Sequence, residues 1–339
     1  MSLATKYRPQ TLDSVCGQSS VKAILQQQLD SGEIQHAYLF TGSAGTGKTS
    51  VGRIFANELN KGQGSPLELD AASNNSVDDI RNIIQQAKIK SMDSEYRIFL
   101  LDEIQALSSN GFQALLKILE EPPKTAIFIL CTTNPERIPK TILSRVQQFQ
   151  FSRISQQEVF NRLTYVIEQE NAEGRNYKVT DEALKYVCKL SEGGLRDALT
   201  LLEKCLAYSP DLTLDKVVEA LGVVDYEVFF DLSDAINARD SKSVIEIIEN
   251  IYMGGKDLKQ FTKDFMGFLL DINKYDITRS FDYLQLPSTY SDALNNYTAQ
   301  WYNTCRNLLP VIVKLNYEIK WDSQPKTAIE ARLLTETIK

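Results

Sequence analysis

The segment that most constrains the fold of this chain is the run Gly42-Ser43-Ala44-Gly45-Thr46-Gly47-Lys48-Thr49. It matches the pattern G-x-x-x-x-G-K-[ST], in which backbone N–H groups turn inward around a phosphate and the lysine reaches the β- and γ-phosphates. An apolar run, His36–Thr41, precedes it and an amphipathic run, Thr49–Asn60, follows it. A glycine-rich turn without a ligand does not require this strand-and-helix context. The pattern therefore predicts a nucleotide-binding α/β domain, in which Thr49 binds Mg²⁺ and Ser50 lies beside the phosphates.

A second apolar run, Arg97–Leu101, ends in two carboxylates, Asp102 and Glu103. The first carboxylate suits coordination of Mg²⁺, and the second suits orienting and deprotonating an attacking water. A solvated acidic loop is the alternative, and the phosphate-binding pattern upstream argues against it. Asp102 is therefore a predicted metal ligand and Glu103 a predicted general base.

Apolar and amphipathic runs alternate up to about residue 153, which is typical of a parallel sheet covered by helices. Further strands are expected at Leu67–Asp70, Ala126–Thr132 and Val146–Phe151. Helices are expected at Val77–Ala87, with a cap near Ser76, and at Ser109–Leu119, which Pro122 and Pro123 terminate.

Beyond residue 153 the apolar residues recur only at helical spacing. The expected helices of this part are Gln156–Gln169, Asp181–Ser191, Leu195–Ala207 and Leu214–Leu221, followed by helical patterns from Tyr226 onward. The 339 residues are enough for two or three domains with their own cores. We expect three: 1–153, 154–222 and 223–339.

Composition excludes several classes of protein. Five scattered cysteines and the single His36 form no C-x-x-C pair, so no zinc site or disulfide framework is expected, and the thiols should be reduced and mostly buried. His36 itself is expected to be structural. The chain shows no apolar run of membrane-spanning length and no signal peptide, which favours a cytoplasmic protein without membrane contact. The net charge of −7 comes from the part after residue 153 and argues against a surface coated with DNA-binding charge.

Six segments together resemble the gamma/tau family of subunits of the bacterial DNA polymerase III clamp loader. They are Tyr7–Gln18, His36–Gly42, Asp70–Asp79, Leu115–Pro123, Ile142–Arg145 and Gly193–Ala198. This resemblance implies a P-loop AAA+ domain at 1–153, a helical lid domain at 154–222 and an all-α collar domain at 223–339. The family usually carries a four-cysteine zinc module before the Asp70 segment, and this chain has no cysteine between Asn60 and Pro66.

The resemblance also implies roles for residues that spacing alone does not single out. Thr133 would sense the γ-phosphate, and Arg145 would act in trans as an arginine finger on the ATP of a neighbouring subunit. Arg196 would contact the phosphates of the chain's own ATP, and Arg8 and Pro9 would lie near the adenine. An arginine supplied in trans can accelerate phosphoryl transfer by about 10³–10⁵.

The family assembles as a five-membered ring with related delta and delta-prime type subunits and further copies of itself. Its partners would be a sliding clamp and primed-template DNA, and its cofactors ATP and Mg²⁺. Two alternatives stay open: a scaffold subunit of the same loader that does not hydrolyse ATP, and a DNA-translocating AAA+ motor such as a branch-migration helicase. The residues considered for DNA contact are Asn74, Asn75, Asn110, Arg81, Lys88, Lys90 and Lys117, and a solvated helix face explains each of them equally well.

Overall fold

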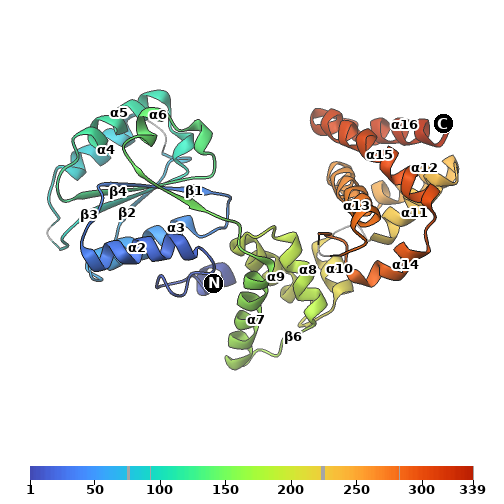
Figure 1. Ribbon diagram of the computed structural model, residues 1–339, viewed down its shortest axis with the longest axis horizontal. Coiled ribbons are helices and arrows are strands. Elements are labelled where there is room, and N and C mark those ends of the chain that lie inside the picture. Colours follow the sequence, from blue (N-terminus) through green and yellow to red (C-terminus); the bar gives the residue numbers. More distant parts are fainter. Residues whose placement is uncertain (75–76, 92, 223–225, 282, 339) are drawn as a thin grey trace. The chain divides into compact units, whose positions relative to one another are not determined.

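The computed structural model describes residues 1–74, 77–91, 93–222, 226–281 and 283–338. The chain forms two compact units, Met1–Thr213 and Leu214–Lys339 (Figure 1). None of the helices in the described ranges combines the length and the apolar character needed to span a bilayer.

A five-stranded parallel sheet forms the centre of the first unit, with the strand order β2-β3-β4-β1-β5. The strands are β1 (Ala37–Gly42), β2 (Leu67–Asp70), β3 (Arg97–Asp102), β4 (Ala126–Thr132) and β5 (Gln147–Phe151). Every residue of β4 is buried, because this strand lies in the middle of the sheet and is covered on both faces. Continuous apolar runs of this kind are typical of central parallel strands.

Helices cover both faces of the sheet (Figure 1). On one face lie α4 (Val77–Ala87), α5 (Ser109–Glu120) and the short α6 (Lys140–Leu143), whose buried side chains pack against Phe99, Phe128 and Leu130. On the other face lie α2 (Ser19–Ser31) and α3 (Lys48–Leu59), which pack against Tyr38 and Phe40. The predicted α/β class is confirmed. The predicted elements of this region are present with ends shifted by at most one residue, and the predicted cap at Ser76 lies outside the described residues.

The rest of the first unit is a small helical group. It contains α7 (Gln156–Ala172), α8 (Asp181–Leu190) and α9 (Leu195–Tyr208), and the short α1 (Leu3–Lys6) contacts α9. The expectation of helices alone in this region was wrong, since β6 (Lys178–Val179) pairs in parallel with β7 (Asp211–Leu212). Two residues per strand are too few to produce a readable alternation of apolar and polar positions.

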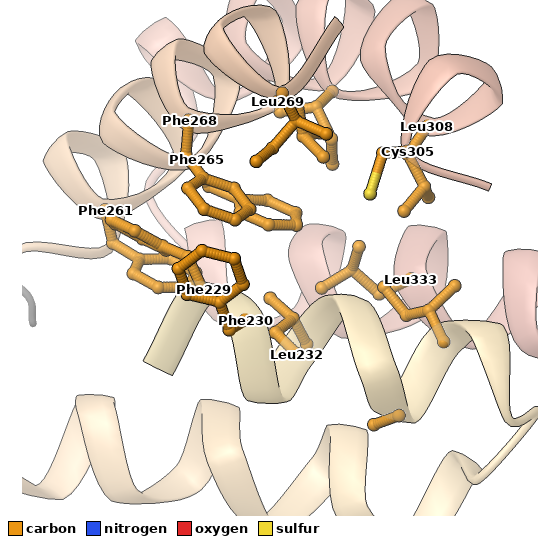
Figure 2. Packing of buried hydrophobic residues seen from close by; sticks show 14 of the residues in the cluster. Phe229, Phe230, Leu232, Phe261, Phe265, Phe268, Leu269, Cys305, Leu308 and Leu333 are labelled. Carbon is orange, nitrogen blue, oxygen red and sulfur yellow. The ribbon is translucent and has the colours of Figure 1, made fainter. Parts of the chain in front are cut away.

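The second unit is entirely helical in the part that the structure describes. It contains α10 (Leu214–Leu221), α11 (Tyr226–Asn237), α12 (Ser241–Met253), α13 (Leu258–Thr278), α14 (Ser291–Asn296), α15 (Ala299–Glu318) and α16 (Pro325–Ile338). Figure 2 shows its core, where Phe229, Phe261 and Phe265 pack together and Leu269 and Cys305 belong to the same buried cluster. The two units part at Thr213, so α10 groups with this second unit, whereas the sequence patterns placed it with the preceding helices.

Candidate nucleotide site

Parallel pairing brings the carboxyl ends of three strands together at one edge of the sheet. β4 lies between β1 and β3, with Thr41 paired to Thr132 and Leu101 paired to Leu130. The glycine-rich segment after β1, the two carboxylates at the end of β3 and Thr133 after β4 therefore lie at the same edge. In open α/β sheets this is the edge at which ligands bind.

In the P-loop, Gly42–Thr49, two glycines stand where any other residue would clash or would be strained. A Cβ on Gly42 would lie 2.3 Å from the carbonyl oxygen of Phe151, because β5 passes directly beside the end of β1. Gly47 precedes α3 with a φ of 100°, a left-handed conformation that favours glycine. Inside the loop, the Thr46 hydroxyl donates a 2.9 Å hydrogen bond to the Ser43 carbonyl. The glycines and this internal hydrogen bond therefore stabilise the turned conformation of the P-loop.

Lys48 points back along the P-loop. Its Nζ donates hydrogen bonds of 2.8 Å to the carbonyl oxygens of Gly42 and Ser43, and the residue is only 6% exposed. Burial lowers the pKa of this ammonium, and the nearby Glu103 and Asp102 carboxylates act in the opposite direction. The structure therefore holds a buried cation at the mouth of the loop, where phosphate oxygens would be its preferred partners.

Thr49 and Asp102 meet across the site. The Thr49 hydroxyl donates a 2.6 Å hydrogen bond to Asp102 Oδ2, and both residues line the same cavity. Two hard oxygen donors at one point fit Mg²⁺, which typically takes one or two protein ligands and fills its remaining positions with phosphate oxygens and water. The donor set therefore suits the metal that the sequence predicts.

Glu103 and Thr133 are in direct contact. The Thr133 hydroxyl donates a 2.9 Å hydrogen bond to Glu103 Oε2, and Gln105 Nε2 donates to the same carboxylate oxygen. Glu103 has a φ of 51°, in the left-handed region, as it begins the 3₁₀ turn Ile104–Ala106. A non-glycine residue held in this region is uncommon, and such outliers cluster at functional sites.

A cavity of about 580 Å³ joins the P-loop to the N-terminal segment and to α9. Its lining brings together these predicted site residues: Arg8, Pro9, Ala44, Gly45, Thr46, Gly47, Lys48, Thr49, Ser50, Asp102, Glu103 and Arg196. Gly42 holds the Lys48 ammonium, and Ser43 lines an adjoining hollow with Gly194 and Asp197. The residues predicted to contact the phosphates, the metal and the adenine therefore line one cavity.

Contacts with the small helical group keep the N-terminal segment beside the cavity. Lys6 forms a 2.6 Å ion pair with Glu170 on α7, and the Tyr7 hydroxyl donates to the same carboxylate at 2.9 Å. These contacts lower the pKa of the Glu170 carboxyl, with Lys6 as the main cause. Across the cavity, the Leu195 N–H donates a 3.0 Å hydrogen bond to the Gly45 carbonyl. The helical group therefore contacts both the P-loop and the segment that carries Arg8.

Arg145 lies apart from these residues and is not among the described residues that line the cavity. Its Nη2 forms a 2.9 Å ion pair with Glu120 Oε1, its Nη1 donates to the Thr141 carbonyl at 2.7 Å, and its side chain is 35% exposed. Exposed ion pairs of this kind contribute only about 0.2–1 kcal/mol. The guanidinium can therefore leave Glu120 at small cost.

Three residues that sequence reasoning did not single out belong to this site. Gln105 donates hydrogen bonds to Glu103 and Thr133, and the Thr132 hydroxyl donates to Gln105. Gln18 donates to the carbonyl oxygens of Thr46 and Ser152 and so joins the P-loop to the end of β5. Their signal in the sequence is slight: each is a polar residue within or beside a motif, and most of their partners are distant along the chain.

The prediction that the cysteines and His36 form no zinc site can be tested by metal analysis. All five cysteines are free thiols, and four of them are buried. Within the described residues, no group of three or more His, Cys, Asp or Glu side chains is placed to hold a metal ion. We expect elemental analysis of the purified chain to find no stoichiometric zinc. One zinc per chain that survives dialysis would contradict this prediction and would require distant thiols to meet.

Two family profiles match this chain. A profile described as "DNA polymerase III, delta subunit" matches residues 67–155, and one described as "DNA polymerase III subunits gamma and tau domain III" matches residues 212–334. The first spans the sheet region from β2 to β5, and the second covers nearly all of the second unit.

Individual relatives extend this similarity along most of the chain. The DNA polymerase III subunit tau of Bacillus subtilis is 32% identical over 97% of this chain, and the subunit gamma/tau of Mycobacterium tuberculosis is 36% identical over 80% of it. The chain spans only 62% and 50% of the lengths of these two relatives. It spans 80% of the subunit gamma of Buchnera aphidicola, which is 31% identical over 80% of this chain.

Solved structures show the same fold in a more distant protein. The RuvB Holliday junction branch migration motor of Thermotoga maritima superposes with a TM-score of 0.52 and covers 68% of this chain and 79% of its own. The identity is 21%, so this likeness concerns the AAA+ fold alone.

Proposed function

Because the chain belongs to the family of the DNA polymerase III gamma and tau subunits, we propose that it is the ATP-hydrolysing motor subunit of a sliding-clamp loader. In this role it would open the clamp and place it on primed DNA during replication, as part of a DNA polymerase III holoenzyme. One observation carries the proposal: Lys48, Thr49, Asp102 and Glu103 converge on one cavity that Arg196 also lines.

Each residue has a part in the proposed hydrolysis. The Lys48 ammonium would leave the carbonyls of Gly42 and Ser43 and bind oxygens of the β- and γ-phosphates. Thr49 and Asp102 would hold Mg²⁺, which when bound neutralises charge on those phosphates. Glu103 would orient the attacking water and accept its proton.

Two further groups would complete the reaction. Thr133 would give its hydroxyl hydrogen bond to the γ-phosphate instead of to Glu103, and so report that ATP rather than ADP is bound. Arg145 of one subunit would reach the ATP of its neighbour. Two observations support this role. Arg145 is not among the described residues that line the cavity of its own chain, and its ion pair with Glu120 is partly exposed.

The proposed assembly is a five-membered ring. It would contain delta and delta-prime type subunits together with further copies of this chain, and it would bind a sliding clamp and primed-template DNA. The support comes from the second unit, since nearly all of it matches the profile of gamma and tau domain III. Because the net charge of the chain is acidic, we expect DNA contact at local basic patches rather than over a broad surface.

One groove is a candidate for such a patch. It has a volume of about 740 Å³ and lies between α4 and α5, where Arg81, Lys88 and Lys117 share its lining with Asn110. Asp78 and Glu121 line it as well, so the groove is mixed in charge. Lys90 is exposed at the end of the same region, and Asn75 lies outside the described residues.

Two alternative functions make different predictions. A branch-migration motor shares the AAA+ fold, and its ATPase would respond to duplex DNA alone. The ATPase of a clamp loader would respond to primed DNA together with a clamp. A scaffold subunit would not hydrolyse ATP in either case. The presence of all four residues proposed to bind phosphate, hold the metal and act as the base argues against a scaffold role.

Glu103→Gln tests the proposed chemistry. We expect this variant to bind ATP and clamp normally, because the amide has the same shape as the carboxylate. Turnover should fall by about 10²–10⁴-fold, since the amide cannot accept a proton. The measurements are steady-state ATPase with primed DNA and clamp, and nucleotide affinity by fluorescence titration.

Glu33→Gln is the matched control, because Glu33 is exposed in the loop before β1 and has no part in the cavity. It should turn over ATP at the wild-type rate. Wild-type turnover in Glu103→Gln would place the base elsewhere.

A further inference from the structure

Gln105 occupies the centre of a hydrogen-bond network at the ends of β3 and β4. Its Nε2 donates to Glu103 Oε2 and, at 2.9 Å, to Thr133 Oγ1. Its Oε1 accepts a 2.7 Å hydrogen bond from Thr132 Oγ1, a hydroxyl of a fully buried residue. The Thr132 oxygen in turn accepts from the Asn134 N–H at 3.1 Å. The amide therefore connects the predicted base to a fixed point in the sheet.

Donors and acceptors balance throughout this network. The two N–H groups of the Gln105 amide go to Glu103 and Thr133, and its oxygen takes the hydroxyl hydrogen of Thr132. The hydroxyl hydrogen of Thr133 goes to Glu103. A flipped amide would place its oxygen against the Glu103 carboxylate, so the orientation of the side chain is determined by its partners.

This balance changes when Thr133 turns to another acceptor. A threonine has one hydroxyl hydrogen, so Thr133 cannot donate to Glu103 and to a phosphate at the same time. Once that bond is lost, Gln105 is the remaining donor in the network that holds the carboxylate. We propose that Gln105 is a positioning residue, which anchors Glu103 to Thr132 and sets where the base stands when the γ-phosphate takes the Thr133 hydroxyl. This inference rests on the proposed ATPase function.

The surroundings of Gln105 allow substitutions of equal length. The side chain also lines a hollow of about 500 Å³, together with Leu107, Phe112 and Arg137. Gln105→Met keeps the length of the side chain and removes its hydrogen bonds. Gln105→Glu keeps both the length and an oxygen for Thr132, but it places a second carboxylate against Glu103.

The two variants should separate a positioning role from a packing role. We expect Gln105→Met to lower kcat by about 10- to 100-fold, the usual effect of losing a hydrogen bond to a charged group. The dissociation constant for a non-hydrolysable ATP analogue should stay within about twofold, since Gln105 is outside the nucleotide cavity. Gln105→Glu should lower kcat further, because like charges repel. A packing role would instead rank the near-isosteric Gln105→Glu as the milder change.

Gln26→Met makes the same chemical change on the exposed face of α2 and should leave kcat unchanged. Thermal unfolding of each variant identifies any that loses its fold. Wild-type kcat in Gln105→Met, or a milder loss in Gln105→Glu than in Gln105→Met, would overturn the proposal.

Crystal structures of the full chain with a non-hydrolysable ATP analogue bound provide a second measurement. Once the γ-phosphate takes the Thr133 hydroxyl, the Glu103 carboxylate should stay at hydrogen-bond distance from the Gln105 amide in the wild type and move away from this position in Gln105→Met. An unmoved carboxylate would overturn the inference even if the rates change. A wild-type chain that binds ATP but never hydrolyses it would reject the proposed function, and these two structures would still decide the role of Gln105.

Discussion

Lys48→Ala should abolish ATP binding at working nucleotide concentrations. Removing one partner of a buried, hydrogen-bonded charge pair costs about 2–5 kcal/mol, which corresponds to a loss of affinity of roughly 30- to 5,000-fold. Here the loss should lie at the upper end, since Lys48 is only 6% exposed and two carbonyls of the P-loop hold its ammonium at the site. Turnover should disappear together with binding. Fluorescence titration with labelled nucleotide measures the effect directly.

The fold should survive this substitution. Gly42 is half-buried and Ser43 is exposed, so water can replace the ammonium at their carbonyls. Lys185→Ala is the matched control, because Lys185 is exposed on α8 and its removal should change neither affinity nor thermal stability. Unchanged nucleotide affinity in Lys48→Ala would reject the assignment of Gly42–Thr49 as a phosphate-binding loop.

Much of the sheet could be predicted from the sequence, because its central strands are buried on both faces. The predicted strand Ala126–Thr132 has the same bounds as β4, and each of its residues is buried. The P-loop could also be predicted, because glycines in this spacing before a lysine and a threonine rarely serve a function other than phosphate binding. The two-residue strands β6 and β7 are below the length at which alternation can be read.

The hydrogen bonds around Glu103 could not be predicted in this way. Gln105 meets Thr132 and Thr133 only because β3 and β4 pair in a parallel register, which places residues 27 and 28 positions apart side by side. A glutamine two positions after a carboxylate has no distinctive meaning in a sequence. The roles of Thr133, Arg145 and Arg196 came from family resemblance, since a hydroxyl at a strand end or an arginine on a helix has many uses. These roles stay predictions.

Arg145→Ala should leave ATP binding intact and lower turnover by about 10³–10⁵-fold, the contribution of an arginine finger. The two effects separate because Arg145 does not line the cavity of its own chain in the described structure. Its ion pair with Glu120 is partly exposed, so the fold should lose at most about 1 kcal/mol of stability. Glu120→Gln is the matched control: it breaks the same ion pair and keeps the guanidinium, so turnover should persist.

Mixing two inactive variants then distinguishes an arginine that acts in trans from one that acts in cis. An Arg145→Ala chain keeps its phosphate-binding loop, and a Lys48→Ala chain keeps its arginine. In a ring that contains both, the intact pocket of the first can meet the intact arginine of the second, so mixed rings should regain turnover that neither variant has alone. Exchange of labelled subunits between rings, followed by fluorescence transfer, establishes that mixing has occurred. An arginine acting in cis gives no rescue at any ratio, because every chain then lacks one of the two groups that its own site needs. Turnover that stays at the level of the two parents after demonstrated exchange would therefore place the site within a single subunit.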